Sequence, residues 1–356
     1  MSLKTVPHYC IIKEKATRSL FMNNRIKKLF PTAVIASLLV SGCAGSPPAE
    51  TQPLKSEVTS AVTEITTETT TSVTTEEIIQ EVPYMEQFKD SITELIPEGF
   101  EEPIEGVTYS EFKKYTYYSS TAERDTNVYV LLPPDYSEDK EYPVLYVLHG
   151  FYDNETWMIR PVVNLSTIYG NLLAKGEAEE MIIVSPYMFC DKNMPYCTGM
   201  DLANCLAYDN FINDLTTDLM PFIESEFSVA KGRENAAITG FSMGGRESLF
   251  IGFKRPDLFG YIGSVCAAPG LVELPNSAMH PGQMTMEEMK FSENNPYLIL
   301  ISSSENDGVV GSNPDNYRRI MTRNDVEYLS HVMKKTGHDH TSVKPHLYNL
   351  LKMLFK

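Results

Sequence analysis

Gly240-Phe241-Ser242-Met243-Gly244-Gly245 is the stretch that decides the fold of this chain. It follows a short apolar run at residues 236–239 and precedes a helix-forming segment that starts at residue 246. The order strand, Gly-x-Ser-x-Gly, helix predicts a nucleophile elbow, in which a serine lies at the apex of a sharp turn. Glycines are expected on both sides because so strained a turn leaves little room for side chains. Ser242 is therefore the candidate nucleophile, with an ordinary glycine-rich turn as the alternative.

The segments around this stretch alternate between strand and helix patterns. Strands are expected at residues 107–118, 127–132, 143–148, 181–185, 236–239, 261–265 and 297–302. Helices are expected at residues 162–175, 208–227, 246–251, 326–336 and 346–355. Near-continuous apolar strands that alternate with helices predict a doubly wound, mostly parallel sheet with helices on both faces. With the elbow, this α/β pattern favours the α/β-hydrolase fold for residues 84–356.

The other members of a catalytic triad are expected after the serine, in the order acid and then histidine. Asp307 lies on a turn-prone loop after the last apolar strand, where ligand sites of open α/β sheets form. Glu305 is its closer rival, and Asp315 also competes. His338 and His340 share one late polar loop, and their position alone does not choose the general base.

Two backbone N–H groups are the candidate oxyanion hole. One belongs to Met243, directly after the nucleophile, and the other to Phe151, which follows His149-Gly150 at the end of an apolar strand. Gly150 is expected to let this backbone approach closely, and His149 is expected to shape the loop. His149 and Trp157 are also candidate substrate contacts, with packing in the core as the alternative for Trp157.

Several motifs in the correct order resemble those of a family of α/β-hydrolase esterases that includes carbohydrate esterase family 1, the feruloyl and acetylxylan esterases. They lie at residues 142–150 with Trp157, 240–245, 256–259, 267–269, 306–307 and 337–345. The resemblance implies that His338 rather than His340 is the base, and it favours Asp307 as the acid. It also implies that no metal or other cofactor is needed.

The resemblance implies a serine esterase that removes feruloyl or acetyl groups from plant cell-wall polysaccharide such as xylan, through an acyl-enzyme. Its substrate partner is then an acylated oligosaccharide or polysaccharide. Acyl transfer to an alcohol, and hydrolysis of small esters or thioesters, are alternatives within the same family. A non-catalytic, glycan-binding surface lipoprotein is the alternative from another class of proteins.

Residues 190–197 depart from the feruloyl esterase pattern, because this segment is longer and richer in cysteine. Outside the cell, Cys190 and Cys197 are a candidate disulfide, and free buried thiols are the alternative. No spacing of histidines and cysteines suggests a zinc site. The substrate contacts of the family therefore cannot be carried over to this segment.

The N-terminal segment has the pattern of an export signal. Arg25, Lys27 and Lys28 precede an apolar run at residues 29–40, which is too short to form a stable transmembrane helix. Small residues and Cys43 then resemble the lipobox of bacterial lipoproteins. We expect residues 1–43 to be a signal segment, Cys43 to carry the lipid, and Met22 to be the true start.

Residues 44–83 are dominated by threonine, glutamate, serine and proline, and residues 44–82 contain no aromatic side chain. Such a segment buries too little apolar surface to offset its ordering entropy, so we expect a disordered linker. The net charge of −17 argues against nucleic-acid binding, which requires a basic surface. The expected location is extracytoplasmic, with contact to a membrane only through the lipid, or secreted from a bacterium.

Overall fold

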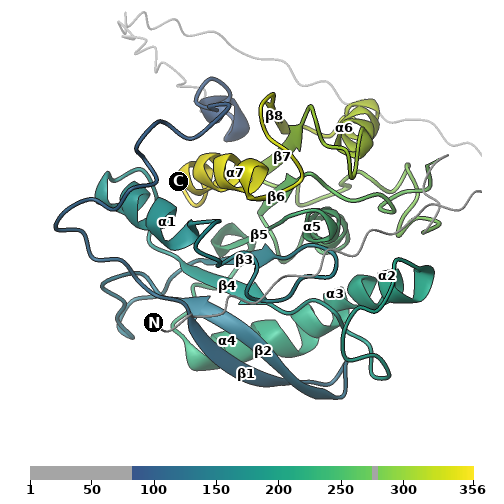
Figure 1. Ribbon diagram of the computed structural model, residues 1–356, viewed down its shortest axis with the longest axis horizontal. Helices are drawn as coiled ribbons and strands as arrows, with labels where there is room; N and C mark the ends of the chain where they lie inside the picture. The colour runs from purple at the N-terminus through teal and green to yellow at the C-terminus, as the bar shows by residue number, and fades with distance from the viewer. Residues whose placement is uncertain (1–81, 275–279) are drawn as a thin grey trace, which may run out of the picture. The chain divides into compact units, whose positions relative to one another are not determined.

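A computed structural model describes residues 82–274 and 280–356, in which eight strands form one sheet in the order β1-β2-β4-β3-β5-β6-β7-β8 (Figure 1). Strand β2 runs antiparallel to both of its neighbours, β1 and β4. The remaining neighbours, from β4 to β8, pair in parallel. The predicted mostly parallel α/β sheet is therefore confirmed.

The strands lie close to the apolar runs of the sequence. Their bounds are β1 Lys113–Ser119, β2 Arg124–Leu131, β3 Val144–Leu148, β4 Ile182–Pro186, β5 Ala236–Gly240, β6 Tyr261–Val265, β7 Leu298–Ser304 and β8 Leu329–Met333. Every residue of β3 is buried, and its side chains alternate between two hydrophobic clusters, with Val144 and Tyr146 in one and Leu145 and Val147 in the other. A strand covered on both faces must be apolar at every position, which explains its continuous run.

The helices cover both faces of this sheet. Their bounds are α1 Leu165–Ala174, α2 Leu202–Asp209, α3 Phe211–Asp214, α4 Met220–Glu226, α5 Met243–Lys254, α6 Asn313–Arg323 and α7 His340–Met353. Short 3-10 turns lie at Met85–Phe88 and Arg233–Asn235. Residues of α1 and α7 join one hydrophobic cluster, and residues of α2 to α6 join the other.

The helix predicted over residues 208–227 is present only in pieces. It is divided into the end of α2, α3, a π-helical turn at Leu215–Leu219, and α4. Pro221 lies in the first turn of α4, where it has no N–H to donate to the carbonyl of Thr217. The helical spacing of the apolar residues was therefore right, but the backbone ladder is interrupted.

The helix predicted over residues 326–336 is wrong, because this segment contains the edge strand β8. Along β8 the burial alternates: Leu329, His331 and Met333 are buried, whereas Ser330 and Val332 are exposed. A histidine at a buried position and a valine at an exposed one hide the period of two from a hydrophobicity pattern. The loop that carries His338 therefore lies between a strand and a helix, and α6 precedes it without having been predicted.

His346 connects α7 to the middle of the sheet. Its Nε2 lies 2.7 Å from Thr239 Oγ1 on β5, and its Nδ1 lies 2.7 Å from Ser302 Oγ on β7. The side chain is fully buried, and burial, assisted by the charge of His331, lowers its pKa to about 3. The imidazole is therefore neutral in the folded protein at physiological pH.

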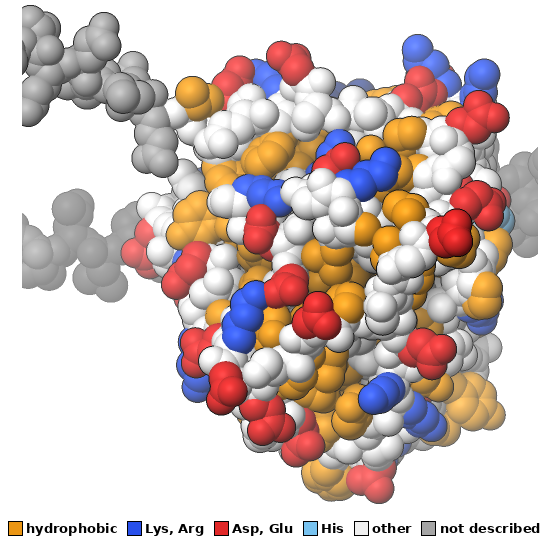
Figure 2. All heavy atoms as spheres, turned by 90° about the vertical axis from the view of Figure 1, so that its left-hand side faces the viewer, with side chains coloured by type: hydrophobic (Ala, Val, Ile, Leu, Met, Phe, Trp, Pro, Cys, Tyr) orange, Lys and Arg blue, Asp and Glu red, His pale blue; other side chains and the backbone are white. Residues whose placement is uncertain are grey.

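Charges of both signs lie on one face of the molecule that Figure 2 shows. Figure 2 shows the face that lies on the left-hand side of Figure 1, where acidic and basic side chains are interspersed with hydrophobic ones. Within the part of the chain that the structure describes, no helix is long and apolar enough to cross a membrane. The predicted signal segment (residues 1–43), its lipidation site Cys43 and nearly all of the predicted linker (residues 44–83) lie outside the described residues.

Candidate active site

The Gly-x-Ser-x-Gly stretch forms the predicted sharp turn between β5 and α5. Ser242 has φ 56° and ψ −111°, a backbone conformation that non-glycine residues rarely adopt. Hydrogen bonds hold it from both sides: its N–H donates to the Val265 carbonyl (3.0 Å), and its carbonyl accepts from Ala268 N–H (2.9 Å). The end of β6 therefore maintains the strained turn at the nucleophile position.

Two glycines of this turn have no room for a side chain. A Cβ on Gly240 would lie 2.4 Å from the carbonyl of Gly244, and a Cβ on Gly244 would lie 2.4 Å from the carbonyl oxygen of Leu148. Both obstacles are backbone atoms, which cannot rotate away as the end of a side chain can. The expected need for small residues around Ser242 is confirmed at these two positions.

The structure brings Ser242, His338 and Asp307 into one chain of hydrogen bonds. Ser242 Oγ lies 2.9 Å from His338 Nε2, and His338 Nδ1 lies 2.7 Å from Asp307 Oδ2. The three side chains come from the loops after β5, β8 and β7, at the carboxyl ends of these parallel strands. This arrangement allows the histidine to take a proton from the serine while the carboxylate orients the ring.

Asp307 is the acid that the fold places beside the histidine. Its Oδ1 accepts hydrogen bonds from Val309 N–H (2.9 Å) and Val310 N–H (3.0 Å), which fix the carboxylate. Burial opposes ionisation, but the hydrogen bonds from His338 and Val310 hold the pKa of Asp307 below its usual value. The carboxylate is therefore charged at neutral pH.

The rival side chains lie elsewhere. Glu305 is exposed, and Asp315 forms an ion pair with Arg318 within α6. His340 is the first residue of α7, whereas His338 precedes it on the loop that reaches Ser242. The start of α7 thus separates the two histidines that position in the sequence did not distinguish.

Cys266 is a neighbour of this site that sequence reasoning missed. Its Sγ, a carboxylate oxygen of Asp307 and a ring nitrogen of His338 all lie within 4.8 Å of one another. The side chain is fully buried, and burial is the main cause that raises the pKa of the thiol to about 12. A thiol that stays protonated is a poor metal ligand, so this grouping fits a hydrogen-bonded site better than a metal site.

The two candidate oxyanion donors lie at the ends of neighbouring strands. β3 and β5 pair in parallel, with Leu148 opposite Gly240, so Phe151 and Met243 follow these strands at the same edge of the sheet. No acceptor within residues 82–274 and 280–356 takes a hydrogen bond from Phe151 N–H. Met243 is the first residue of α5, where backbone N–H groups lack intrahelical partners. Both amides are thus available in the way that an oxyanion hole requires.

The profile of the protein family described as "Putative esterase" matches residues 119–338, which include Ser242, Asp307 and His338. This match covers more than half of the chain. The chain belongs to this family. The protein is a serine esterase with the α/β-hydrolase fold.

Two solved structures of a CE1 ferulic acid esterase from Anaeromyces mucronatus are similar to this esterase. One, without substrate, is 37% identical with a TM-score of 0.70, and the match covers 74% of this chain and 97% of that chain. The other, in complex with ferulic acid, is 38% identical with a TM-score of 0.71 and the same coverage. An S-formylglutathione hydrolase from Staphylococcus aureus, at 18% identity and a TM-score of 0.51, shows the fold alone.

A curated relative is the "Endo-1,4-beta-xylanase/feruloyl esterase" of Xylanibacter ruminicola, which is 30% identical over 163 residues. The match covers 44% of this chain and 22% of that relative. The chain therefore spans about a fifth of the length of this relative.

His149 lies at the start of the loop that carries Phe151, a candidate oxyanion donor. It is fully buried, its Nδ1 lies 2.8 Å from the Gly150 carbonyl, and its Nε2 accepts a hydrogen bond from Met188 N–H (3.1 Å). Because Nε2 must be the acceptor, Nδ1 carries the proton. Burial lowers the pKa of His149 to about 4, against the effect of the Gly150 hydrogen bond. These contacts fit the expected loop-shaping role, and in the buried position of His149 neither ring nitrogen is left to contact a substrate.

The buried histidines predict a loss of stability in mild acid. The pKa values of His149 (about 4) and His346 (about 3) lie below the value of about 6.5 in the unfolded chain. Above pH 6.5 neither state binds these protons; below it the unfolded state binds them first, so the free energy of unfolding falls with pH. At pH 5 the two histidines together should lower the free energy of unfolding by roughly 4 kcal/mol. Urea unfolding between pH 7 and pH 5 measures this decrease in the free energy of unfolding. In His346→Gln only His149 remains of the pair, so the part of the decrease that these two histidines cause should be about half as large. An unchanged slope in the variant contradicts the prediction.

Trp157 packs against the residue before the nucleophile. Its ring stacks on Phe241 with centroids 4.7 Å apart and planes at 5°, and Phe241 in turn lies against His338, with centroids 4.6 Å apart. This column of three rings supports one side of the histidine. One face of the indole is thus used in packing, as the alternative interpretation of Trp157 expected. A contact between Trp157 and substrate stays a prediction.

Cys190 and Cys197 are both free thiols, so the candidate disulfide is wrong. Cys190 is buried beside Asp214, whereas Cys197 is half-buried and its Sγ lies 3.7 Å from the Gly199 carbonyl. Burial, followed by the charge of Asp214, raises the pKa of Cys190 well above its usual value. The alternative, two free thiols, is the one observed. The two side chains lie in different surroundings and do not face each other as a pair.

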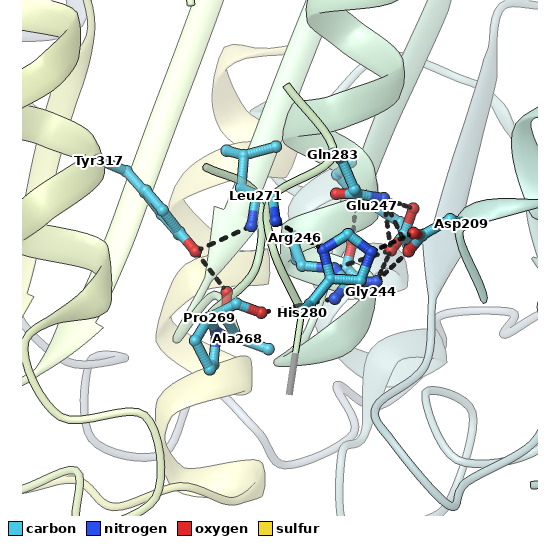
Figure 3. Close-up of polar contacts among 12 residues, drawn as sticks. Asp209, Gly244, Arg246, Glu247, Ala268, Pro269, Leu271, His280, Gln283 and Tyr317 are labelled. Atoms are coloured by element: carbon cyan, nitrogen blue, oxygen red, sulfur yellow. Dashed lines mark hydrogen bonds and ion pairs between the residues drawn. The ribbon is translucent and has the colours of Figure 1, made fainter. Parts of the chain in front are cut away.

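A buried network of charges fixes the segment that follows β6 (Figure 3). Arg246, one turn after Ser242 on α5, is fully buried and forms ion pairs with Asp209 and Glu247. Gln283 donates hydrogen bonds to both carboxylates (2.9–3.1 Å). Arg246 also donates to the Pro269 carbonyl (3.4 Å), next to the Ala268 N–H that holds Ser242. The signal for this network in the sequence was the Arg246-Glu247 pair within a helix whose other residues are mostly buried. An argument from hydrophobic spacing alone assigns such a charged pair to the surface.

Proposed function

We propose that Ser242, His338 and Asp307 form the catalytic triad of an esterase that removes feruloyl or acetyl groups from plant cell-wall polysaccharide such as xylan. The observation that carries this proposal is the continuous chain of hydrogen bonds from Ser242 Oγ to His338 and on to Asp307. The likeness to a feruloyl esterase solved with ferulic acid supports the feruloyl group as the first substrate to test.

The first half of the reaction forms an acyl-enzyme. His338 Nε2 takes the proton of Ser242 as Oγ attacks the ester carbonyl carbon, and the N–H groups of Phe151 and Met243 hold the negative oxygen of the tetrahedral intermediate. The intermediate collapses with cleavage of the bond to the leaving alcohol. His338 gives its proton to that alcohol oxygen, which leaves as a neutral hydroxyl.

The second half returns the free enzyme. A water molecule loses a proton to His338 as its oxygen attacks the acyl carbon, and the same two amides hold the second oxyanion. When the bond to Ser242 breaks, His338 returns its proton to Oγ, and the carboxylic acid leaves. Asp307 remains ionised throughout and stabilises the charged imidazole in both halves.

A panel of esters tests this assignment. Purified protein is given feruloylated and acetylated xylan fragments, methyl ferulate, p-nitrophenyl acetate and S-formylglutathione, with and without glycerol as an alcohol acceptor. We expect release of ferulate or acetate from the xylan fragments with the highest kcat/KM. A clear preference for the thioester, or transfer of the acyl group to glycerol, would identify one of the alternative activities. Binding of the fragments without turnover would identify a glycan-binding protein.

The location of the protein is a separate proposal that depends on the N-terminal pattern. Residues 1–43 are proposed to direct export, with Cys43 as the lipidated first residue of the mature protein. Mass spectrometry of the membrane fraction should find Cys43 modified and no peptide from residues 1–42. An unmodified N-terminus in the soluble fraction would exclude the lipid anchor.

A further inference from the structure

The loop that follows β3 carries a carboxylate that this mechanism does not use. Asp153 lies three residues after Gly150, and its N–H donates to the Gly150 carbonyl (3.3 Å). Its side chain is half-buried. Nothing in the described ranges, 82–274 and 280–356, donates a hydrogen bond to its carboxylate or forms an ion pair with it.

The rest of this loop is fixed by internal hydrogen bonds. Asn154 Oδ1 accepts from Thr156 N–H (3.0 Å) and from Thr156 Oγ1 (2.6 Å). Tyr152 N–H donates to the hydroxyl of Tyr208 (3.1 Å) on α2. The backbone thus holds Asp153 in a defined place, while its carboxylate is left without a protein partner.

Asp153 lies near Phe241, whose ring packs against His338. Its Oδ2 is 3.1 Å from the point where a Cβ on Gly150 would lie, and a ring carbon of Phe241 is 3.3 Å from the same point. The Phe241 ring also lies against the His338 ring. The missing side chain at Gly150 therefore gives the carboxylate room beside Phe241, within the range of the charge on His338.

The charges around Asp153 indicate what it can bind. Burial raises the pKa of Asp153, and the positive charges of Arg160 and His338 oppose this effect. A partly buried carboxylate without a protein donor has lost part of its hydration, and no donor in the described residues replaces that part. An ionised carboxylate only accepts hydrogen bonds, so its missing partner is a donor such as a hydroxyl group.

We propose that Asp153 accepts a hydrogen bond from a hydroxyl group of the leaving alcohol and thereby selects esters of sugars over esters of simple alcohols. This inference rests on the proposed function. His338 must reach the leaving oxygen to protonate it, so the alcohol lies on the His338 side during acylation. Asp153 is connected to that side through Phe241, whose ring packs against His338. A sugar carries hydroxyl donors next to its ester oxygen, whereas methanol carries none.

The test compares the kcat/KM values of three esters: feruloylated arabinose, methyl ferulate and methyl cinnamate. Asp153→Ala should lower the ratio of the sugar ester to methyl ferulate by about 10- to 100-fold, which is typical of a lost hydrogen bond to a charged group. Asp153→Asn should lower it less, because the amide oxygen still accepts. Asp139→Asn is the matched control, since Asp139 is exposed and lies before β3, at the opposite end of that strand.

Two outcomes overturn the inference. Equal losses on the sugar ester and methyl ferulate would mean that Asp153 acts on the loop or on His338. A greater loss on methyl ferulate than on methyl cinnamate would place the carboxylate against the phenol of the acyl group.

A binding measurement separates this inference from the proposed function. Calorimetry on Ser242→Ala protein, with and without Asp153→Ala, measures affinity for a feruloylated arabinoxylan oligosaccharide without turnover. We expect Kd to rise at least about tenfold with Asp153→Ala. An unchanged Kd overturns the role of Asp153, whereas a failed proposed function would appear as wild-type protein that hydrolyses none of the esters.

Discussion

Ser242→Ala is expected to lower kcat for methyl ferulate and p-nitrophenyl acetate by about 10⁶-fold, as loss of the nucleophile does in other serine hydrolases. Oγ is the only atom removed, and it is the atom that lies 2.9 Å from His338 Nε2. Alanine keeps the Cβ, so the strain of the backbone at φ 56° is the same in both proteins. The fold should therefore survive the substitution.

Initial rates with both esters and labelling by a fluorophosphonate probe measure this effect. Urea unfolding shows whether the variant is folded. Ser225→Ala is the matched control, because Ser225 is exposed on α4 and donates only to the Phe222 carbonyl. Activity of Ser242→Ala at the level of this control would remove Ser242 from the mechanism.

Asp307→Asn is expected to lower kcat by about 10⁴-fold with little change in KM. Asparagine fills the same space, and its amide oxygen can still accept from Val309 and Val310 N–H. Its NH₂ group, however, would face His338 Nδ1, which must then become an acceptor. The ring proton moves to Nε2, which faces Ser242, and the histidine can no longer take the proton of the serine.

Glu305→Gln provides the control for Asp307→Asn, because it makes the same charge change two residues away on the exposed part of the loop. It should leave kcat within about twofold, since surface charges interact weakly with distant groups. The kcat values of both variants on methyl ferulate, measured from pH 5 to 9, decide between the two acids. A greater loss in Glu305→Gln would assign the acid to Glu305.

The failure to predict strand β8 has its origin in polar side chains at buried positions. Hydrophobic spacing reports which side chains are buried, and it assumes that the buried ones are apolar. In β8 the buried middle position is His331, whose ring lies 3.0 Å from Ser302 Oγ on β7, and an exposed position is Val332. The fully buried Arg246 and Glu247 on α5 violate the same assumption, because they satisfy each other rather than face water.

The thiols illustrate a different limit. Cys190 and Cys197 are seven residues apart, which permits a bridge, but spacing along a loop does not say which way each side chain points. Cys190 is turned towards Asp214 in the core, and Cys197 stays near Gly199. Cys266, distant from both in sequence, instead comes within 4.8 Å of Asp307 and His338.

The sequence alone determined the α/β sheet, the turn at Ser242 and the order of the candidate triad, because these depend on local signals. Apolar runs specify strands that are covered on both faces. Gly240 and Gly244 are required because backbone atoms lie 2.4 Å from the place that a Cβ would take at each position. The family resemblance selected His338 and Asp307, but only the tertiary structure shows how these groups come to face Ser242. His338 and His340 differ by two residues, and the start of α7 at His340 leaves His338 on the loop that reaches Ser242. The hydrogen bond between Asp307 and His338, and the carboxylate of Asp153 without a donor among the described residues, become visible only when strands far apart in the chain are brought side by side.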